Sequence, residues 1–285
     1  MSLITCIEKM NNVVSGHLRK MTAHLGDSSV VQYQLPVGEN SVELNPLIGQ
    51  TIKLEYTGNI SCSNCGRKTK KSYSQGFCFP CMQKLAQCDM CIMKPETCHF
   101  SKGTCREPDW AEKFCMTDHY VYLSNTSGIK VGITRSNQIP TRWIDQGATQ
   151  GLPIFKVKTR QQSGLIEVAL AKHIADKTNW RAMLKGNAEL LDLKEHSKSL
   201  IKAIEDDLAM LISTLPEASI ERLDEDITEL SFPVTEFPTK VSSLNFDKTP
   251  EIEGNLIGIK GQYLILDTGV LNIRKFSSYE VQVSY

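Results

Sequence analysis

The spacing of apolar and polar residues predicts short β-strands near both ends of the chain. Residues 51–56 (TIKLEY) alternate apolar with polar positions, and a weakly helical stretch precedes them, so we expect a helix and a strand within residues 1–60. After residue 231 come the short segments VSSLNF, NLIGI, QYLILD and VLNIRK, broken by glycines. Such spacing favours a small β-barrel over residues 231–285, closed by the amino-terminal strand.

Between these ends the pattern changes to hairpin and helix. Residues 119–135 indicate two strands joined by a loop that ends at Gly128, and helices are expected after Pro140 and around Glu167. From 188 to 215 leucines and isoleucines recur at mostly helical spacing. This predicts one amphipathic helix within residues 186–230, with its apolar stripe facing the core.

Two CxxC pairs lie within residues 62–81. Twelve residues separate the pair Cys62 and Cys65 from the pair Cys78 and Cys81, and Gly76 indicates a hairpin between them. A CxxC turn points two thiolates at one centre, so the two pairs predict a structural zinc site in a treble-clef or zinc-ribbon-like module over 61–118. A redox or disulfide role is the alternative, and two pairs at this separation without a secretory signal disfavour it.

A second metal site is predicted directly downstream of the first. Its best ligand set is Cys88, Cys91, Cys98 and Cys105, with Cys115 and His119 as a reserve pair. Ligands interleaved with the first site and an iron–sulfur cluster are alternatives that the thiolate count leaves open. Nine of ten cysteines lie between 62 and 115, and the amino terminus lacks signal-peptide features. Both observations favour a reducing, cytoplasmic location without a membrane span.

The net charge is zero, but it is unevenly distributed. Residues 61–185 contain 19 Lys and Arg against 9 Asp and Glu, whereas residues 186–285 contain 9 against 18. Two four-thiolate zinc sites of about −2 each would leave the middle of the chain near +6. A basic middle favours a nucleic-acid partner, and attraction between oppositely charged faces of the same chain is the alternative.

Residues 119–185 resemble the GIY-YIG nuclease superfamily. Tyr120-Val121-Tyr122 stands where the family has its first tripeptide, and Lys130-Val131-Gly132 stands at the second. The resemblance implies that Tyr122 helps to activate water, that Arg142 steadies the phosphorane, and that Glu167 binds one divalent ion, Mg²⁺ or Mn²⁺. Two departures are the tyrosine at the first glycine position and Lys130 at the second tyrosine position. Because its ammonium is normally protonated, Lys130 is expected to contact phosphate.

The sequence therefore predicts an α+β protein with a zinc module, a GIY-YIG-like core and a carboxy-terminal barrel. The layout is also similar to an uncharacterised bacterial family with a domain of unknown function. The expected function is DNA or RNA binding, with endonuclease chemistry at Tyr122, Lys130, Arg142 and Glu167 and with nucleic-acid contacts from Lys130, Arg135 and Arg142. The alternative is a non-catalytic adaptor in which zinc stiffens a protein-binding surface and these residues only pack or form ion pairs.

Overall fold

The chain folds into two compact units in a computed structural model that describes residues 12–26, 28–174, 179–214 and 220–285. The first unit contains the chain up to Thr22 together with Tyr33–Cys78 and Pro233–Tyr285. The second contains Ala23–Gln32 and Phe79–Phe232. Each unit thus combines segments that are distant in the sequence, and the five segment boundaries drawn from the sequence stay predictions.

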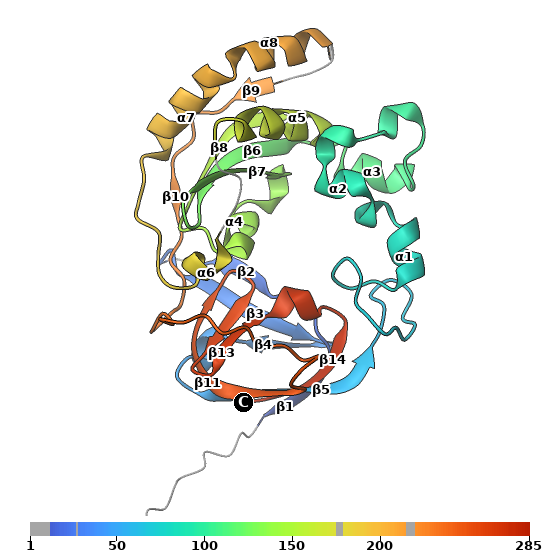
Figure 1. The fold of residues 1–285 in the computed structure, drawn as a ribbon, viewed down its shortest axis with the longest axis vertical. Coiled ribbons are helices and arrows are strands. Elements are labelled where there is room, and N and C mark those ends of the chain that lie inside the picture. The colour runs from blue at the N-terminus through green and yellow to red at the C-terminus, as the bar shows by residue number, and fades with distance from the viewer. Residues whose placement is uncertain (1–11, 27, 175–178, 215–219) are drawn as a thin grey trace, which may run out of the picture. The chain divides into compact units, whose positions relative to one another are not determined.

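A six-stranded antiparallel sheet in the first unit joins strands from both ends of the chain (Figure 1). In spatial order the strands are β1 (Val13–His17), β14 (Tyr279–Ser284), β5 (Thr51–Ile60), β11 (Glu251–Lys260), β12 (Tyr263–Leu266) and β13 (Gly269–Asn272). The strands predicted at TIKLEY, NLIGI, QYLILD and VLNIRK are confirmed as β5, β11, β12 and β13. VSSLNF contributes an isolated bridge from Ser243 to Val270.

The predicted closed barrel is not confirmed. The described strands pair in an open order with β1 and β13 at its ends, and β5, which was expected to close a barrel, lies in the interior of the sheet. Local alternation specifies that a segment is a strand but not which distant strand it pairs with. The described part of residues 1–60 contains no α-helix, and residues 1–11 lie outside the described residues.

A second, smaller antiparallel pair in the first unit consists of β3 (Val31–Val37) and β4 (Asn40–Glu43). Its buried and half-buried residues alternate along β3, as expected for a strand with one face in a core. The divisions between the units fall within β2 (Thr22–Leu25) and β3. The short helical turns of this unit are η1 (Asn45–Leu47) and η6 (Ile273–Phe276).

The second unit contains an antiparallel sheet in the order β10 (Thr228–Glu229), β8 (Gln150–Val157), β6 (His119–Asn125) and β7 (Ile129–Arg135), with β9 (Ile220–Arg222) also paired to β8. The strands β6 and β7 form the predicted hairpin, in which Tyr122 lies opposite Gly132. Among the described strands β7 is at one edge of the sheet.

Helices cover both faces of this sheet (Figure 1). The helices α5 (Arg160–Ala171), α7 (Leu193–Ala203) and α8 (Glu205–Thr214) pack on the face that carries Val121 and Leu123. The helix α4 (Thr141–Gln146) lies on the opposite face.

The predicted amphipathic helix is two helices, because the backbone leaves the helical conformation at Ile204, between α7 and α8. The remaining turns of the unit include η5 (Ser136–Gln138) and α6 (Trp180–Met183). None of the helices in the described ranges is long and apolar enough to cross a bilayer.

The cysteine-rich part of the second unit is a series of short helical turns. They are α1 (Phe79–Lys84), η2 (Ala86–Cys88), α2 (Met90–Met93), η3 (Pro95–Thr97), η4 (Phe100–Lys102) and α3 (Pro108–Phe114). Between Phe79 and Phe114 the buried residues are Ala86, Pro95 and Ala111. Such a small apolar core needs cross-links, such as metal ligation, to hold its shape.

Candidate functional site

The first cysteine group lies within residues 62–81, as the two CxxC pairs predicted. The sulfurs of Cys62, Cys65, Cys78 and Cys81 all lie within 4.8 Å of one another. The Sγ atoms of Cys65 and Cys78 are 3.8 Å apart. Tetrahedral zinc with Zn–S bonds of about 2.3 Å places its sulfurs about 3.8 Å apart. The four thiols therefore fit a structural zinc ion.

Tight turns hold this group in place. The amide of Gly66 donates to the carbonyl of Cys62 at 2.9 Å, and Gly66 has φ +71°, a left-handed conformation that favours glycine. At Gly76, where φ is +141°, an added Cβ would lie 2.8 Å from Oγ of Ser63. The hydroxyl of Ser278, just before β14, donates to the carbonyl of Gly76 at 2.8 Å. The loop is thus attached to the sheet of the first unit.

The loop also favours the metal-binding form of Cys62. Burial opposes ionisation of the thiol, but hydrogen bonds from the backbone of Cys78, Cys65 and Asn64 outweigh burial and lower the pKa of Cys62 to about 6. The thiolate is the form that binds zinc. One ligand of the group is therefore ready for metal at neutral pH.

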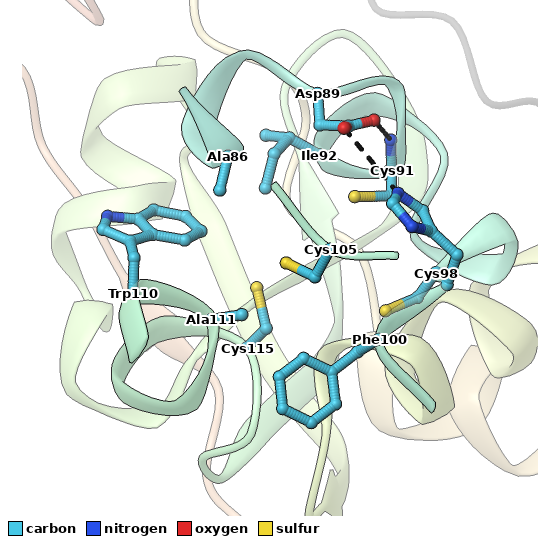
Figure 2. A pocket seen from close by; sticks show the side chains of 11 residues that line it. Ala86, Asp89, Cys91, Ile92, Cys98, Phe100, Cys105, Trp110, Ala111 and Cys115 are labelled. Carbon is cyan, nitrogen blue, oxygen red and sulfur yellow. Dashed lines mark hydrogen bonds and ion pairs between the residues drawn. The ribbon is translucent and has the colours of Figure 1, made fainter. Parts of the chain in front are cut away.

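A second group of cysteines lines one small pocket in the second unit (Figure 2). Its members are Cys91, Cys98, Cys105 and Cys115. Ile92, Phe100 and Trp110 contribute apolar walls. The cavity measures about 20 Å³, which is room for about one water-sized sphere.

Burial and the neighbouring acidic groups in this pocket disfavour ionised cysteines that are not bound to a metal. Burial, followed by the neighbouring charges of Asp89 and of the other three thiols, raises the pKa of Cys91 to about 11. Burial also raises the pKa of Cys115, although the guanidinium of Arg160 acts in the opposite direction. A divalent cation reverses such a balance because it stabilises coordinated thiolates directly.

Asp89 and His99 lie close to Cys91, and the ligand atoms of these three residues are within 4.8 Å of one another. The carboxylate of Asp89 already pairs with Nε of Arg106 at 2.6 Å and faces Nε2 of His99 at 3.7 Å. Nδ1 of His99 lies 2.8 Å from the hydroxyl of Thr104. The charge of Asp89 is therefore compensated without a metal.

The structure brings together only part of the predicted second ligand set. Cys91, Cys98 and Cys105 share the pocket with the reserve residue Cys115, while Cys88, at the end of η2, is not part of the pocket lining. The other reserve residue, His119, is buried in β6 with Nδ1 2.7 Å from the carbonyl of Thr117. Burial lowers the pKa of His119 to about 4, so its imidazole is neutral.

Tyr122 lies among the residues that the family resemblance singled out. Its buried hydroxyl donates to Oε1 of Gln146 at 3.1 Å and also hydrogen-bonds to Arg142. The carboxylate of Glu167 lies within electrostatic range of the same hydroxyl. Burial raises the pKa of Tyr122, and Arg142 only partly offsets this effect. The hydroxyl is therefore neutral at physiological pH and cannot act as a general base.

Two glycines make room for the aromatic rings at this site. An added Cβ at Gly132 would lie 2.6 Å from the hydroxyl of Tyr122, and one at Gly151 would lie 2.3 Å from the ring of Trp143. The two rings meet edge to face with centroids 5.9 Å apart. The glycine of the second motif thus has a physical role, because its missing side chain lets the tyrosine lie across β7.

The two remaining predicted nucleic-acid contacts are on β7. Lys130 is two residues from Gly132, so it shares the face of the strand over which Tyr122 lies. Arg135 is at the end of the strand, with its guanidinium carbon 4.7 Å from the centroid of the Phe114 ring. Strand alternation therefore places Lys130, but not Arg135, on the same face as Tyr122.

Two further residues at this site were missed by the sequence analysis. Gln146 follows Arg142 by four residues on α4, so the two share a helix face. Arg160 begins α5, and its guanidinium lies within electrostatic range of Arg142 and Glu167. The spacing in the sequence could have indicated Arg160, because it precedes Glu167 by seven residues, or about two helical turns, and so lies on the same side of the helix.

Residues 49–281 match the profile of a family described as a protein of unknown function, DUF2797, and the chain therefore belongs to that family. The matched range includes both cysteine groups and the residues around Tyr122. No curated protein and no solved structure matches the chain. The expected membership of an uncharacterised family is confirmed, and the GIY-YIG resemblance stays a prediction.

Proposed function

We propose that this protein binds nucleic acid and cleaves its phosphodiester backbone with one divalent ion, Mg²⁺ or Mn²⁺, held by Glu167. The observation that carries the proposal is that the hydroxyl of Tyr122 hydrogen-bonds to Arg142 and lies within electrostatic range of Glu167. They come from β6, α4 and α5, so local sequence does not bring them together. A guanidinium, a carboxylate and a neutral hydroxyl suit phosphoryl chemistry.

Each residue has a distinct task in this proposal. Arg142 binds the phosphate bidentately and stabilises the charge that develops on its oxygens. Tyr122 stays neutral and, with Gln146, orients that guanidinium. Glu167 supplies the carboxylate for a hard cation that otherwise takes phosphate oxygens and water as ligands. The bound cation would supply Lewis acidity and a more acidic water. Lys130, on the Tyr122 face of β7, contacts a flanking phosphate.

Exposed basic residues support the binding part of the proposal. The loop between Cys62 and Cys78 carries four of them, and all are exposed: Arg67, Lys68, Lys70 and Lys71. Lysines and arginines held on a rigid loop attract a polyanion without reading its sequence. We propose two zinc ions for the chain, one at each cysteine group, and a stiffening role for the zinc at Cys62–Cys81.

A cleavage assay on single-stranded, duplex and branched substrates of DNA and RNA tests this function. With Mg²⁺ or Mn²⁺ the wild-type protein should cut at least one substrate, and without added divalent ion it should not. Glu167→Gln and Arg142→Lys should each lower the rate by about 100-fold or more with a nearly unchanged melting temperature. Glu195→Gln, at an exposed position in the first turn of α7, is the matched control and should keep full activity.

The adaptor alternative predicts a different outcome. Wild-type protein would then cut none of the substrates under any divalent ion. Glu167→Gln would lower the melting temperature and leave nucleic-acid binding intact, because the carboxylate would only be part of an ion pair. That combination would reject the nuclease proposal.

A further inference from the structure

We infer that Cys91, Cys98, Cys105 and Cys115 hold a zinc ion and that this second centre fixes the amino-terminal turn of α5. All four side chains line the same pocket, as Figure 2 shows. Cys91 lies in α2, Cys98 and Cys105 lie between α2 and α3, and Cys115 directly follows α3, in a segment that has almost no apolar core. Four thiols facing one cavity in such a segment are typical of a structural metal site.

The size of the cavity favours a single ion. Its volume of about 20 Å³ is close to that of one water-sized sphere. An iron–sulfur cluster adds several iron and sulfide atoms between its cysteines and needs more room. The four sulfurs do not all lie within 4.8 Å of one another, unlike those of Cys62, Cys65, Cys78 and Cys81, so a single zinc ion would draw the thiolates together when it binds.

Charge compensation favours Cys115 over Cys88 as the fourth ligand. Four thiolates around Zn²⁺ carry about −2, so a buried centre is stabilised by a nearby cation. The guanidinium of Arg160 lies within electrostatic range of both Cys115 and Cys91. Cys115 is buried and lines the pocket, whereas Cys88 lies outside its lining.

The first turn of α5 is hydrogen-bonded directly to the cysteine segment. The amide of Arg160 donates to the carbonyl of Cys115 at 2.8 Å, and its Nη2 donates to the carbonyl of Ile92 at 2.8 Å. Nε2 of Gln161 donates to the carbonyl of Cys98 at 3.2 Å. Each of these carbonyls belongs to a proposed ligand or its neighbour, so the positions of the ligands set the position of the helix start.

The same face of α5 continues to Glu167. Arg160, Gly164 and Glu167 are spaced i, i+4 and i+7, which places them along one side of a helix. At Gly164 the turn η3 comes so close that an added Cβ would lie 2.6 Å from Cβ of Pro95. We therefore expect loss of the second zinc to displace Glu167 and reduce cleavage. That last step rests on the proposed function, whereas the metal centre does not.

Zinc content per chain, measured by elemental analysis on the full-length protein, tests the centre. Wild type should contain two zinc ions, and Cys105→Ser and Cys115→Ser should contain one. Cys88→Ser and His99→Asn are matched controls and should keep two. In the Cys115→Ser protein the amides of the first turns of α5 should exchange hydrogen faster than in wild type, while those of β5 should not.

Several results would overturn the inference. Two zinc ions in Cys115→Ser with only one in Cys88→Ser or His99→Asn would reject the ligand set. Iron with inorganic sulfide in the purified protein would reject zinc. If Cys115→Ser does not fold, cobalt-substituted wild type decides: absorption from two four-sulfur sites supports the centre, and absorption from one contradicts it. All these readouts are independent of cleavage, so failure of the nuclease proposal leaves them unchanged.

Discussion

Burial of Tyr122 holds its ring in place and also keeps its hydroxyl neutral. A neutral hydroxyl does not suit the water-activating role that the family resemblance implies. The family resemblance implies Tyr122, Arg142 and Glu167 as candidates, and in the structure the hydroxyl of Tyr122 hydrogen-bonds to Arg142 and lies within electrostatic range of Glu167. The sequence does not reveal that Tyr122 is fully buried, nor that Gln146 accepts its proton in a hydrogen bond. Protonation depends on the surrounding packing, which a short motif does not encode. The tyrosine is better suited to orienting Arg142 than to activating water.

Lys260 in β11 is a second buried polar residue, and it allows the energetic cost of burying one charged group to be measured. Its side chain is fully buried, with Nζ 5.4 Å from the centroid of the Phe237 ring. Burial lowers the pKa of Lys260 from 10.5 to about 8. At pH 7 the amine is charged in both the folded and the unfolded chain, and a shift of this size corresponds to a cost of roughly 3 kcal/mol.

We expect Lys260→Met to raise the free energy of unfolding at pH 7 by about 1–3 kcal/mol. Between pH 8 and 10.5 the folded wild-type chain loses this proton before the unfolded chain does, so the cost of burial falls as pH rises. The advantage of the variant should therefore shrink across that window. Urea denaturation at pH 7 and pH 10 measures both values. Exposed Lys240→Met is the control, and an advantage that stays constant with pH would contradict the argument.

At the scale of elements, the residue pattern predicts a strand or helix correctly where the contacts that stabilise it are close in the sequence. The hairpin β6–β7 and the strands β11 to β13 follow from alternation and glycine-marked turns, and the structure confirms them. The break at Ile204 and the interior position of β5 follow from packing against distant segments. Periodicity alone could not predict either feature. The same limit applies to the second cysteine group, because which thiols share a pocket depends on how the short turns fold.

The close packing of η3 against α5 at Gly164 can be tested with one substitution. Gly164→Ala should lower the melting temperature and speed the release of the second zinc, because the new Cβ would lie 2.6 Å from Cβ of Pro95 and 2.8 Å from the amide of Glu96. Alanine gains about 1 kcal/mol in helix propensity, but overpacking typically costs 1–3 kcal/mol. A melting curve and a zinc-release trace measure the two effects.

Gly186→Ala is the matched control for this substitution. An added Cβ at Gly186 meets nothing within 4 Å, so the substitution should change neither melting temperature nor zinc release. Equal stability of the two variants would show that η3 does not restrain α5.

For the whole molecule, the distribution of charge is the property that bears most directly on the proposed nucleic-acid partner. Part of the basic excess is neutralised internally, since Lys156 and Lys158 both pair with Asp118 at 3.1 and 3.2 Å. Lys172 pairs in the same way with Asp207. The basic residues between Cys62 and Cys78 are exposed. Composition predicts the sign of the middle region, and only the structure shows which charges are already compensated.

The most direct test of the account is a salt titration of nucleic-acid affinity. Binding of wild type should weaken steeply as salt rises, because lysine and arginine contacts release counterions from the phosphates. Lys130→Glu and Arg135→Glu should weaken binding to all sequences alike, while Lys198→Glu, at an exposed position on α7, should change it little. Affinity that is flat with salt and unchanged in both variants, or no binding to DNA or RNA at all, would contradict the account.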